Sequence, residues 1–262
     1  MKLKNLTKII LFIFQDVSRS RWVFFYSIIQ LLITFILMFF SDDTDKTIVS
    51  LLNLTLILNP VISLIFSTVY FYNSREFIEL LISQPIRRLT VFAGLYLGVS
   101  FTLILIFVFS IGIPFIINSP ENYPILLVLF ISGSLLTLIY VGIAIGIAHL
   151  FDDRAAGLGA VLMIWLFFAV LYDGIILFGT FFFSDYPLEL PVLFASIFNP
   201  IDLGRITVML KLNYAALMGY TGAVFEKFFG NNIGIIITFS AMILWVIIPI
   251  WIAKHIFEKK DF

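Results

Sequence analysis

Residues 75–88 read REFIELLISQPIRR and lie between two long apolar segments, residues 48–72 and 91–117. Each apolar segment is long enough to cross a lipid bilayer, which takes about 20 residues of helix. The charged stretch between them must lie in water at one face of the membrane. The sequence therefore predicts a membrane protein in which a polar loop, residues 73–90, connects the second and third transmembrane helices.

This loop has the pattern of a short surface helix. Glu76 and Glu79 are one helical turn apart, and Leu80 and Leu81 follow directly. Such spacing gives a helix one polar and one apolar side, which suits a position along the membrane surface. Pro85 cannot continue the helix and favours an extended conformation at the residue before it. A short charged helix between two spans offers a surface against which a motor protein can act.

The composition bounds the class of protein. Of the 262 residues, 61% are hydrophobic and 12% are charged, which excludes a soluble globular domain and indicates one transmembrane domain over residues 1–262. The chain has no cysteine, hence no disulfide and no thiolate metal site. Its net charge is zero, and no basic cluster favours a nucleic-acid partner. His149 and His255 lie far apart, so we predict no metal site.

The hydropathy pattern predicts an all-α integral membrane fold with six transmembrane helices. The expected spans are residues 22–40, 48–72, 91–117, 125–150, 157–183 and 233–253. Residues 1–20 place apolar side chains at helical spacing with lysines between them, which predicts an amphipathic helix at the membrane interface. Prolines interrupt residues 184–232, and we expect one or two short helices there, lying on the outer membrane surface.

The distribution of basic residues predicts the orientation. One set of loops and termini holds twelve of them: Lys2, Lys4, Lys8, Arg19, Arg21, Arg75, Arg87, Arg88, Arg154, Lys254, Lys259 and Lys260. The other set holds four: Lys46, Arg205, Lys211 and Lys227. By the positive-inside rule the first set is cytoplasmic. We therefore expect an inner-membrane protein with both termini and residues 73–90 in the cytoplasm and residues 184–232 in the periplasm.

Few polar groups lie inside the expected spans. Asp173 is the one ionisable residue well inside a span, in the outer half of the fifth. It fits a substrate path or a dimer interface as well as a carboxylate that reaches the headgroups. Asn59, Ser63 and Ser67 form a stripe on one face of the second span. Such a stripe more often packs against another helix than it lines a substrate path or a dimer interface.

The sequence contains no catalytic motif and no phosphate-binding loop. We therefore expect a protein that is not an enzyme and that holds no cofactor of its own. If it moves a substrate against a gradient, a separate chain must hydrolyse the nucleotide. An intramembrane enzyme would need at least two facing polar residues, and Asp173 is the one candidate.

The central loop resembles that of a known family. Glu79-Leu80-Leu81, Ser83-Gln84-Pro85, Arg87-Arg88 and the spacing of Gly94, Tyr96 and Gly98 are similar to the signature of type-2 ABC transporter permeases. The resemblance implies a homodimer in the lipid bilayer, paired with a cytoplasmic ATPase dimer that binds ATP and Mg. It also implies which residues couple to the ATPase: Glu76, Glu79, Ser83, Gln84, Pro85, Arg87 and Arg88.

Three further stretches resemble one branch of this family, the permeases that support nitrous oxide reductase maturation. They are Leu171-Tyr172-Asp173, residues 152–156 and residues 199–205, which read NPIDLGR. The resemblance implies a periplasmic accessory protein and a copper or sulfur species as cargo. Leu95 departs from the pattern, because many members have a lysine there. Alternatives are an exporter of another cargo (drug, ion or polysaccharide), a permease for gliding motility, and a membrane anchor without transport.

The stretch at residues 199–205 also has a local interpretation. Asn199-Pro200 predicts a turn, because the residue before a proline avoids the helical conformation. We expect Asp202 to be the N-cap or a first-turn acid of the helix that follows, and Arg205 to form an exposed pair with it. An exposed pair of this kind stabilises a helix by only about 0.5 kcal/mol. We therefore expect Asn199, Pro200, Asp202 and Arg205 to form a surface for the periplasmic protein, the alternative being a turn that only orders the segment.

Overall fold

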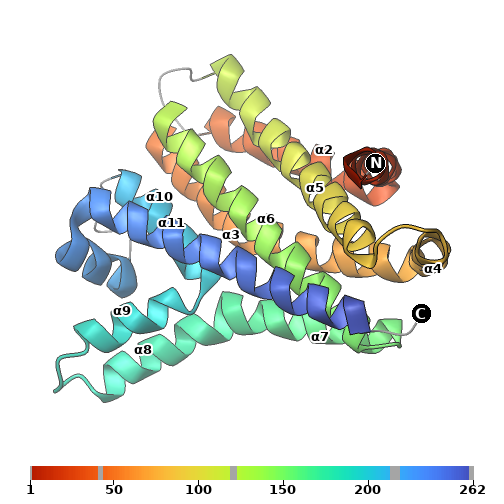
Figure 1. Cartoon of the computed structure of the whole chain (residues 1–262). Helices are drawn as coiled ribbons and strands as arrows, with labels where there is room; N and C mark the ends of the chain where they lie inside the picture. The colour runs from red at the N-terminus through yellow and green to blue at the C-terminus, as the bar shows by residue number, and fades with distance from the viewer. Residues whose placement is uncertain (1, 41–43, 119–122, 213–218, 260–262) are drawn as a thin grey trace.

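The computed structural model describes residues 2–40, 44–118, 123–212 and 219–259, and over these residues the protein is helical without any strand (Figure 1). The helices are α1 (Lys2–Ser18), α2 (Arg21–Phe40), α3 (Thr44–Asn73), α4 (Arg75–Ser83), α5 (Arg88–Asn118), α6 (Tyr123–Leu150), α7 (Arg154–Leu166), α8 (Tyr172–Phe182), α9 (Glu189–Ile197), α10 (Pro200–Leu212) and α11 (Gly219–Lys259). A π-helical segment, Phe167–Leu171, joins α7 to α8.

Six segments of the described chain are long and apolar enough to cross a membrane, which confirms a multi-pass helical membrane protein. They are Arg21–Phe40, Lys46–Asn73, Arg88–Ile117, Pro124–Leu150, Arg154–Phe182 and Asn232–Lys259, numbered here as spans one to six. Span five combines α7, the π-helical segment and α8. Gly230 divides α11 ahead of span six, with a φ of 64° that glycine adopts without strain.

The centre of the bundle is formed by α3, α6, α10 and α11, and small residues let the helices approach closely. A Cβ added at Gly142 of α6 would lie 3.3 Å from Pro249 of α11, and one at Gly146 would lie 3.6 Å from Ala253. Asn59 of α3 is buried and donates from Nδ2 to the carbonyl oxygen of Gly133, at 2.7 Å, and to Thr137, at 3.0 Å, both on α6. Asn59 thus packs against α6.

The N-terminal helix is amphipathic as expected, and its apolar side packs on α5. Ile9 and Ile13 of α1 are buried. They lie over Gly94 and Gly98, where an added Cβ would come within 2.5 Å and 2.8 Å of them. α1, α4 and the last turns of α11 lie at the same end of the molecule (Figure 1).

The segment between spans five and six differs from the expectation of short surface helices. α9 and α10 form a pair bent by 109°. α10 does not lie on a surface, because eleven of its thirteen residues are buried. It packs against α11, α6 and α3, and Gly204 lets it approach Leu56 and Leu136. The surface prediction was wrong for α10 because its few polar groups find partners inside the protein. Residues 213–218 lie outside the described chain.

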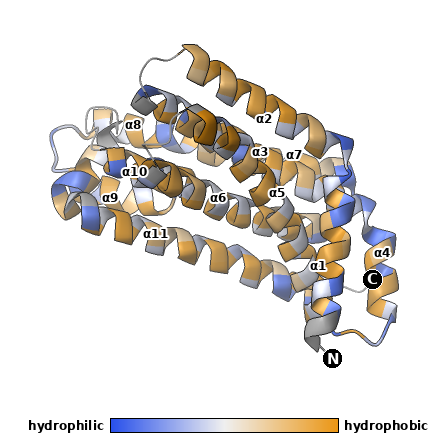
Figure 2. Ribbon diagram, turned by 90° about the horizontal axis from the view of Figure 1, so that it is seen from above, coloured by the Kyte–Doolittle hydropathy of each residue, from blue (hydrophilic) through white to orange (hydrophobic). Residues whose placement is uncertain are grey.

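The outer surfaces of several spans are apolar (Figure 2). In span five only 6% of the most apolar stretch is buried inside the chain, the smallest share among the six spans. Large exposed side chains such as Phe178 and Phe181 of α8 would be costly in water. These surfaces therefore suit lipid or another apolar partner.

Candidate functional sites

The first candidate site is the surface of α4, whose apolar side holds it on the bundle. Ile78 and Leu81 are buried, and Phe77 stacks on Phe12 of α1 with ring centroids 4.8 Å apart. Gln84 ends the helix with φ −79° and ψ 159°, the extended conformation that the following proline favours. The expected short helix and its end are thus present.

The other side of α4 and the loop after it, residues 84–87, are exposed and carry most of the residues expected to couple to an ATPase. Those that are exposed are Glu76, Glu79, Ser83, Gln84, Pro85 and Arg87. Arg88 differs, because it is only partly exposed and donates from Nη1 to the backbone carbonyl of Glu258 on α11, at 3.0 Å. Leu80 lies among the exposed residues with 64% of its surface accessible. The coupling residues expected from the sequence do not include Leu80. It lies one position after Glu79 and four after Glu76, a helical spacing that could have placed it on the same side.

Polar contacts tie the beginning of α4 to the turn between spans four and five. Arg75 lies 3.5 Å from Asp152 and 3.6 Å from Glu79. The hydroxyl of Tyr72 donates to the carbonyl of Phe151 at 2.8 Å. Asp153 caps α7 by accepting from the N–H of Ala156 at 3.0 Å. The turn at residues 152–156 therefore has a structural role: it joins span five to the base of α4.

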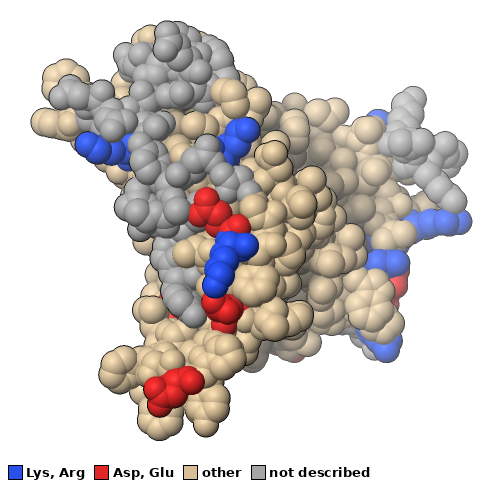
Figure 3. Space-filling view, turned by 90° about the vertical axis from the view of Figure 1, so that its left-hand side faces the viewer, with Lys and Arg blue, Asp and Glu red and all other residues tan. Residues whose placement is uncertain are grey.

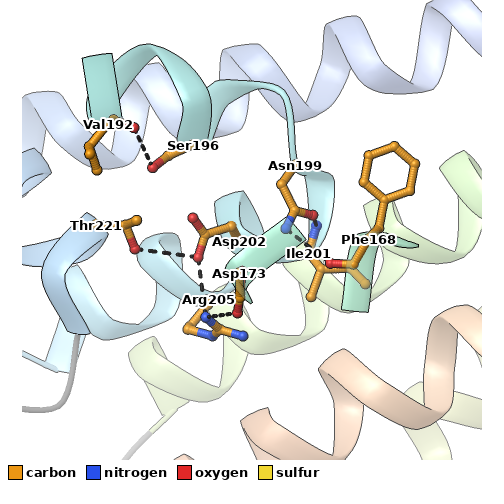
Figure 4. Close-up of polar contacts among 9 residues, drawn as sticks. All are labelled: Phe168, Asp173, Val192, Ser196, Asn199, Ile201, Asp202, Arg205 and Thr221. Carbon is orange, nitrogen blue, oxygen red and sulfur yellow. Dashed lines mark hydrogen bonds and ion pairs between the residues drawn. The ribbon is translucent and has the colours of Figure 1, made fainter. Parts of the chain in front are cut away.

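The second candidate site is an ionic cluster between span five and α10 (Figure 4). Nη1 of Arg205 lies 2.9 Å from Oδ2 of Asp173 and 3.3 Å from Oδ1 of Asp202. Thr221 of α11 contacts the same oxygen of Asp202 at 3.5 Å. The Asp202 side chain is only 1% exposed, whereas those of Asp173 and Arg205 are 30% and 28% exposed. Oδ2 of Asp202 has no hydrogen-bond partner among the described residues.

Asn199 connects this cluster to the π-helical segment. Its side-chain oxygen accepts from the N–H of Ile201 at 3.0 Å, so Asn199 is the N-cap of α10. Its Nδ2 donates to the carbonyl of Phe168 at 3.1 Å. The wider turn of a π-helix displaces carbonyl groups from their usual partners, and Asn199 supplies a donor for one of them. Pro200 occupies the first helical position, which proline favours.

These contacts decide one expectation for residues 199–205 and correct another. Of the two roles expected for Asp202, the structure has the acid in the first turn of α10, and Asn199 is the N-cap. The exposed pair expected between Asp202 and Arg205 is instead a cluster with Asp173, and Asn199, Pro200 and Asp202 are buried. The error arose because the partner of Arg205 lies 32 positions away in the sequence. A contact between this turn and a separate protein stays a prediction.

The other expected site residues are internal. Ser63 is 1% exposed and Asn59 is 2% exposed, so both lie within the chain rather than on a face open to a second copy. In the described part of the protein, no group of three or more His, Asp or Glu residues is arranged to hold a metal ion. The end formed by α9, α10 and the beginning of α11 carries few charged residues, some of them adjacent and of opposite sign (Figure 3).

Neither the protein-family models nor the curated proteins include a match to this chain. The resemblance to type-2 ABC permeases therefore stands on the residues quoted above. The structure adds that two of the three stretches resembling the maturation permeases, Leu171–Asp173 and Asn199–Arg205, contact each other through the Asp173–Arg205 pair.

Proposed function

We propose that the chain is the membrane-spanning permease subunit of an ATP-driven transporter, with ATP and Mg bound by separate ATPase chains. The observation that carries this proposal is the construction of α4. Its apolar side is anchored on α1 and the bundle, and its exposed side presents charge around Leu80. An exposed leucine within a polar rim is the arrangement typical of a protein-docking surface.

The contacts of α4 could transmit a movement of this surface to several spans. Span two precedes it, and span three follows after the loop of residues 84–87. Arg75 connects it to the turn before span five, and Arg88 connects the beginning of span three to the end of span six. Force applied to α4 would thus reach four spans.

Orientation, assembly and location follow as parts of the proposal. The twelve-to-four distribution of basic residues favours a cytoplasmic position for α4 and both termini, in the cell's inner membrane. The exposed apolar sides of α2 and span five suit a second copy of the chain as well as lipid. A permease of this kind works as a homodimer on an ATPase dimer.

For the cargo we propose a copper or sulfur species used in nitrous oxide reductase maturation, handed to a periplasmic accessory protein. The support is the resemblance of residues 171–173 and 199–205 to such permeases, together with the contact between these two stretches. Expression of the chain beside a nitrous oxide reductase should allow the reductase to gain its full metal content. An unchanged metal content in cells that lack the chain would favour another cargo.

Co-purification of this chain with a candidate ATPase produced in the same cells tests the ATPase proposal. The replacement Leu80→Asp should reduce recovery of the ATPase at least roughly tenfold, because it places a charge at the centre of the docking surface. Leu11→Asp is the matched control, since Leu11 is 58% exposed on α1 and lies outside the proposed surface. Equal recovery with both variants would show that the ATPase does not dock on α4.

A further inference from the structure

The half of span five distant from α4 is held to the rest of the chain by very few contacts. No residue of the π-helical segment or of α8 is buried. α8 has no extensive packing contact with another described helix. The other half is well anchored, because α7 packs on α3 and α6 and Trp165 donates to the carbonyl of Ile57 at 3.2 Å. Span five therefore has a fixed part and a weakly held part.

The π-helical segment lies at the boundary between these two parts. Its closing bond runs from the N–H of Tyr172 to the carbonyl of Phe167, five residues earlier. Helices bend readily at such points because the usual i to i−4 ladder is interrupted. Asn199 holds the carbonyl of Phe168, within this segment. Beyond it, the described polar contacts from α8 to the α9–α10 pair come from Tyr172 and Asp173.

Arg205 is arranged so that the contact with Asp173 can be released at low cost. One nitrogen of its guanidinium reaches two carboxylates, Asp173 on span five and Asp202 on its own helix. If Asp173 moves away, Arg205 keeps Asp202 as its partner and the buried acid stays paired. Asp173 is 30% exposed and remains accessible to water or headgroups. Breaking an ordinary buried ion pair is unfavourable because it leaves a buried charge without a partner. Release of Asp173 does not have this cost, because Asp202 and Arg205 stay paired.

We propose that the Asp173–Arg205 ion pair is a reversible lock between α8 and the α9–α10 pair, with the π-helical segment as the hinge. While the pair is closed, the beginning of α8 is held to α9 by Tyr172 and to α10 by Asp173. Release of the pair lets α8 move away from α9, while α7 and α10 keep their positions. The lock belongs to this chain alone and does not depend on the proposed ATPase or cargo.

Distance measurements between two spin labels test the lock in the full-length protein in lipid nanodiscs. The chain has no native cysteine, so cysteines at Phe178 of α8 and Phe194 of α9 accept the labels specifically. Both positions are exposed, at 69% and 60%. An excess of unlabelled protein removes distances between copies of the chain. In the protein that carries only these two cysteine substitutions, we expect one main population of distances between the labels.

Asp173→Asn should add a population at longer distance and raise the ratio of long to short distances roughly tenfold, because it removes a charged hydrogen bond. Asp173→Glu keeps the charge and should largely restore the short distance. Glu189→Gln is the matched control, because it removes an exposed ion pair with Lys227 at the same end of the molecule. It should leave the distances unchanged.

Asp202→Asn distinguishes a lock from a general weakening of α10. It keeps the shape of the buried side chain and leaves the Asp173–Arg205 pair in place, so the short distance should persist. A long-distance population of the same size in Asp202→Asn and Asp173→Asn would overturn the proposal, since the cluster would then only stabilise α10. An Asp173→Asn distribution identical to that of the unchanged chain would overturn it as well.

Discussion

The two ends of this protein place their polar and apolar residues in opposite ways. At α4 the charged residues are exposed and the apolar ones, Ile78 and Leu81, are buried. At the α8–α10 end the polar residues Asn199 and Asp202 are buried, while Phe178 and Phe194 are exposed. The difference shows what each region contacts: α4 has the surface of a helix in water, whereas α8 and α9 have surfaces suited to lipid.

The largest expected effect concerns which side of the membrane each end occupies. Single cysteines at Ser83 and at Tyr186 lie at opposite ends of the molecule, and both positions are exposed. An impermeant thiol reagent added to intact spheroplasts should label Tyr186→Cys and not Ser83→Cys, because the positive-inside rule puts α4 in the cytoplasm. Permeabilised cells, in which both should react, are the control. Labelling of Ser83→Cys in intact spheroplasts would reverse the orientation.

A charge reversal tests whether α4 acts as a docking surface. Glu79→Arg combined with Arg87→Glu keeps the net charge but inverts its pattern across the exposed surface of α4 and the loop that follows it. Transport-coupled ATP hydrolysis should fall roughly tenfold, because like charges then meet across the contact. Thermal unfolding in detergent should change little, since both side chains are exposed. Full coupling in this variant would place the docking surface elsewhere.

The α4 end should also be the more sensitive to added volume. Gly94→Ala places a Cβ about 2.5 Å from Ile9, and we expect it to destabilise the packing of α1 on α5 by about 1–3 kcal/mol. A lowered unfolding temperature of the purified protein measures this effect. Gly159→Ala serves as the control, because no atom lies within 4 Å of the added Cβ. Equal stability of the two variants would mean that α1 is not held by close packing.

The α10 end should instead depend on individual hydrogen bonds. Asn199→Ala removes the N-cap of α10 and the donor to the carbonyl of Phe168, and it should destabilise the protein by about 1–2 kcal/mol. Asn73→Ala is a suitable comparison, because Asn73 is exposed and accepts one bond from Arg154. Its effect on the unfolding temperature should be smaller. The reverse order would contradict the role given to Asn199.

The sequence by itself determined the features that depend on local properties. The six spans follow from runs of apolar residues, the end of α4 from Pro85, and the cap of α7 from the acidic turn before it. Each arises from residues that are close along the chain, so hydropathy and backbone chemistry are sufficient to predict it.

Only the tertiary structure decided the rest. The partner of Arg205 is 32 positions away, and that of Asn59 is 74 positions away. The burial of α10 depends on how α3, α6 and α11 surround it, because a helix with few polar residues suits a membrane surface or an interior equally by its pattern alone. Long-range contacts of this kind pair the buried polar groups, and the local sequence carries no record of which distant helix supplies each partner.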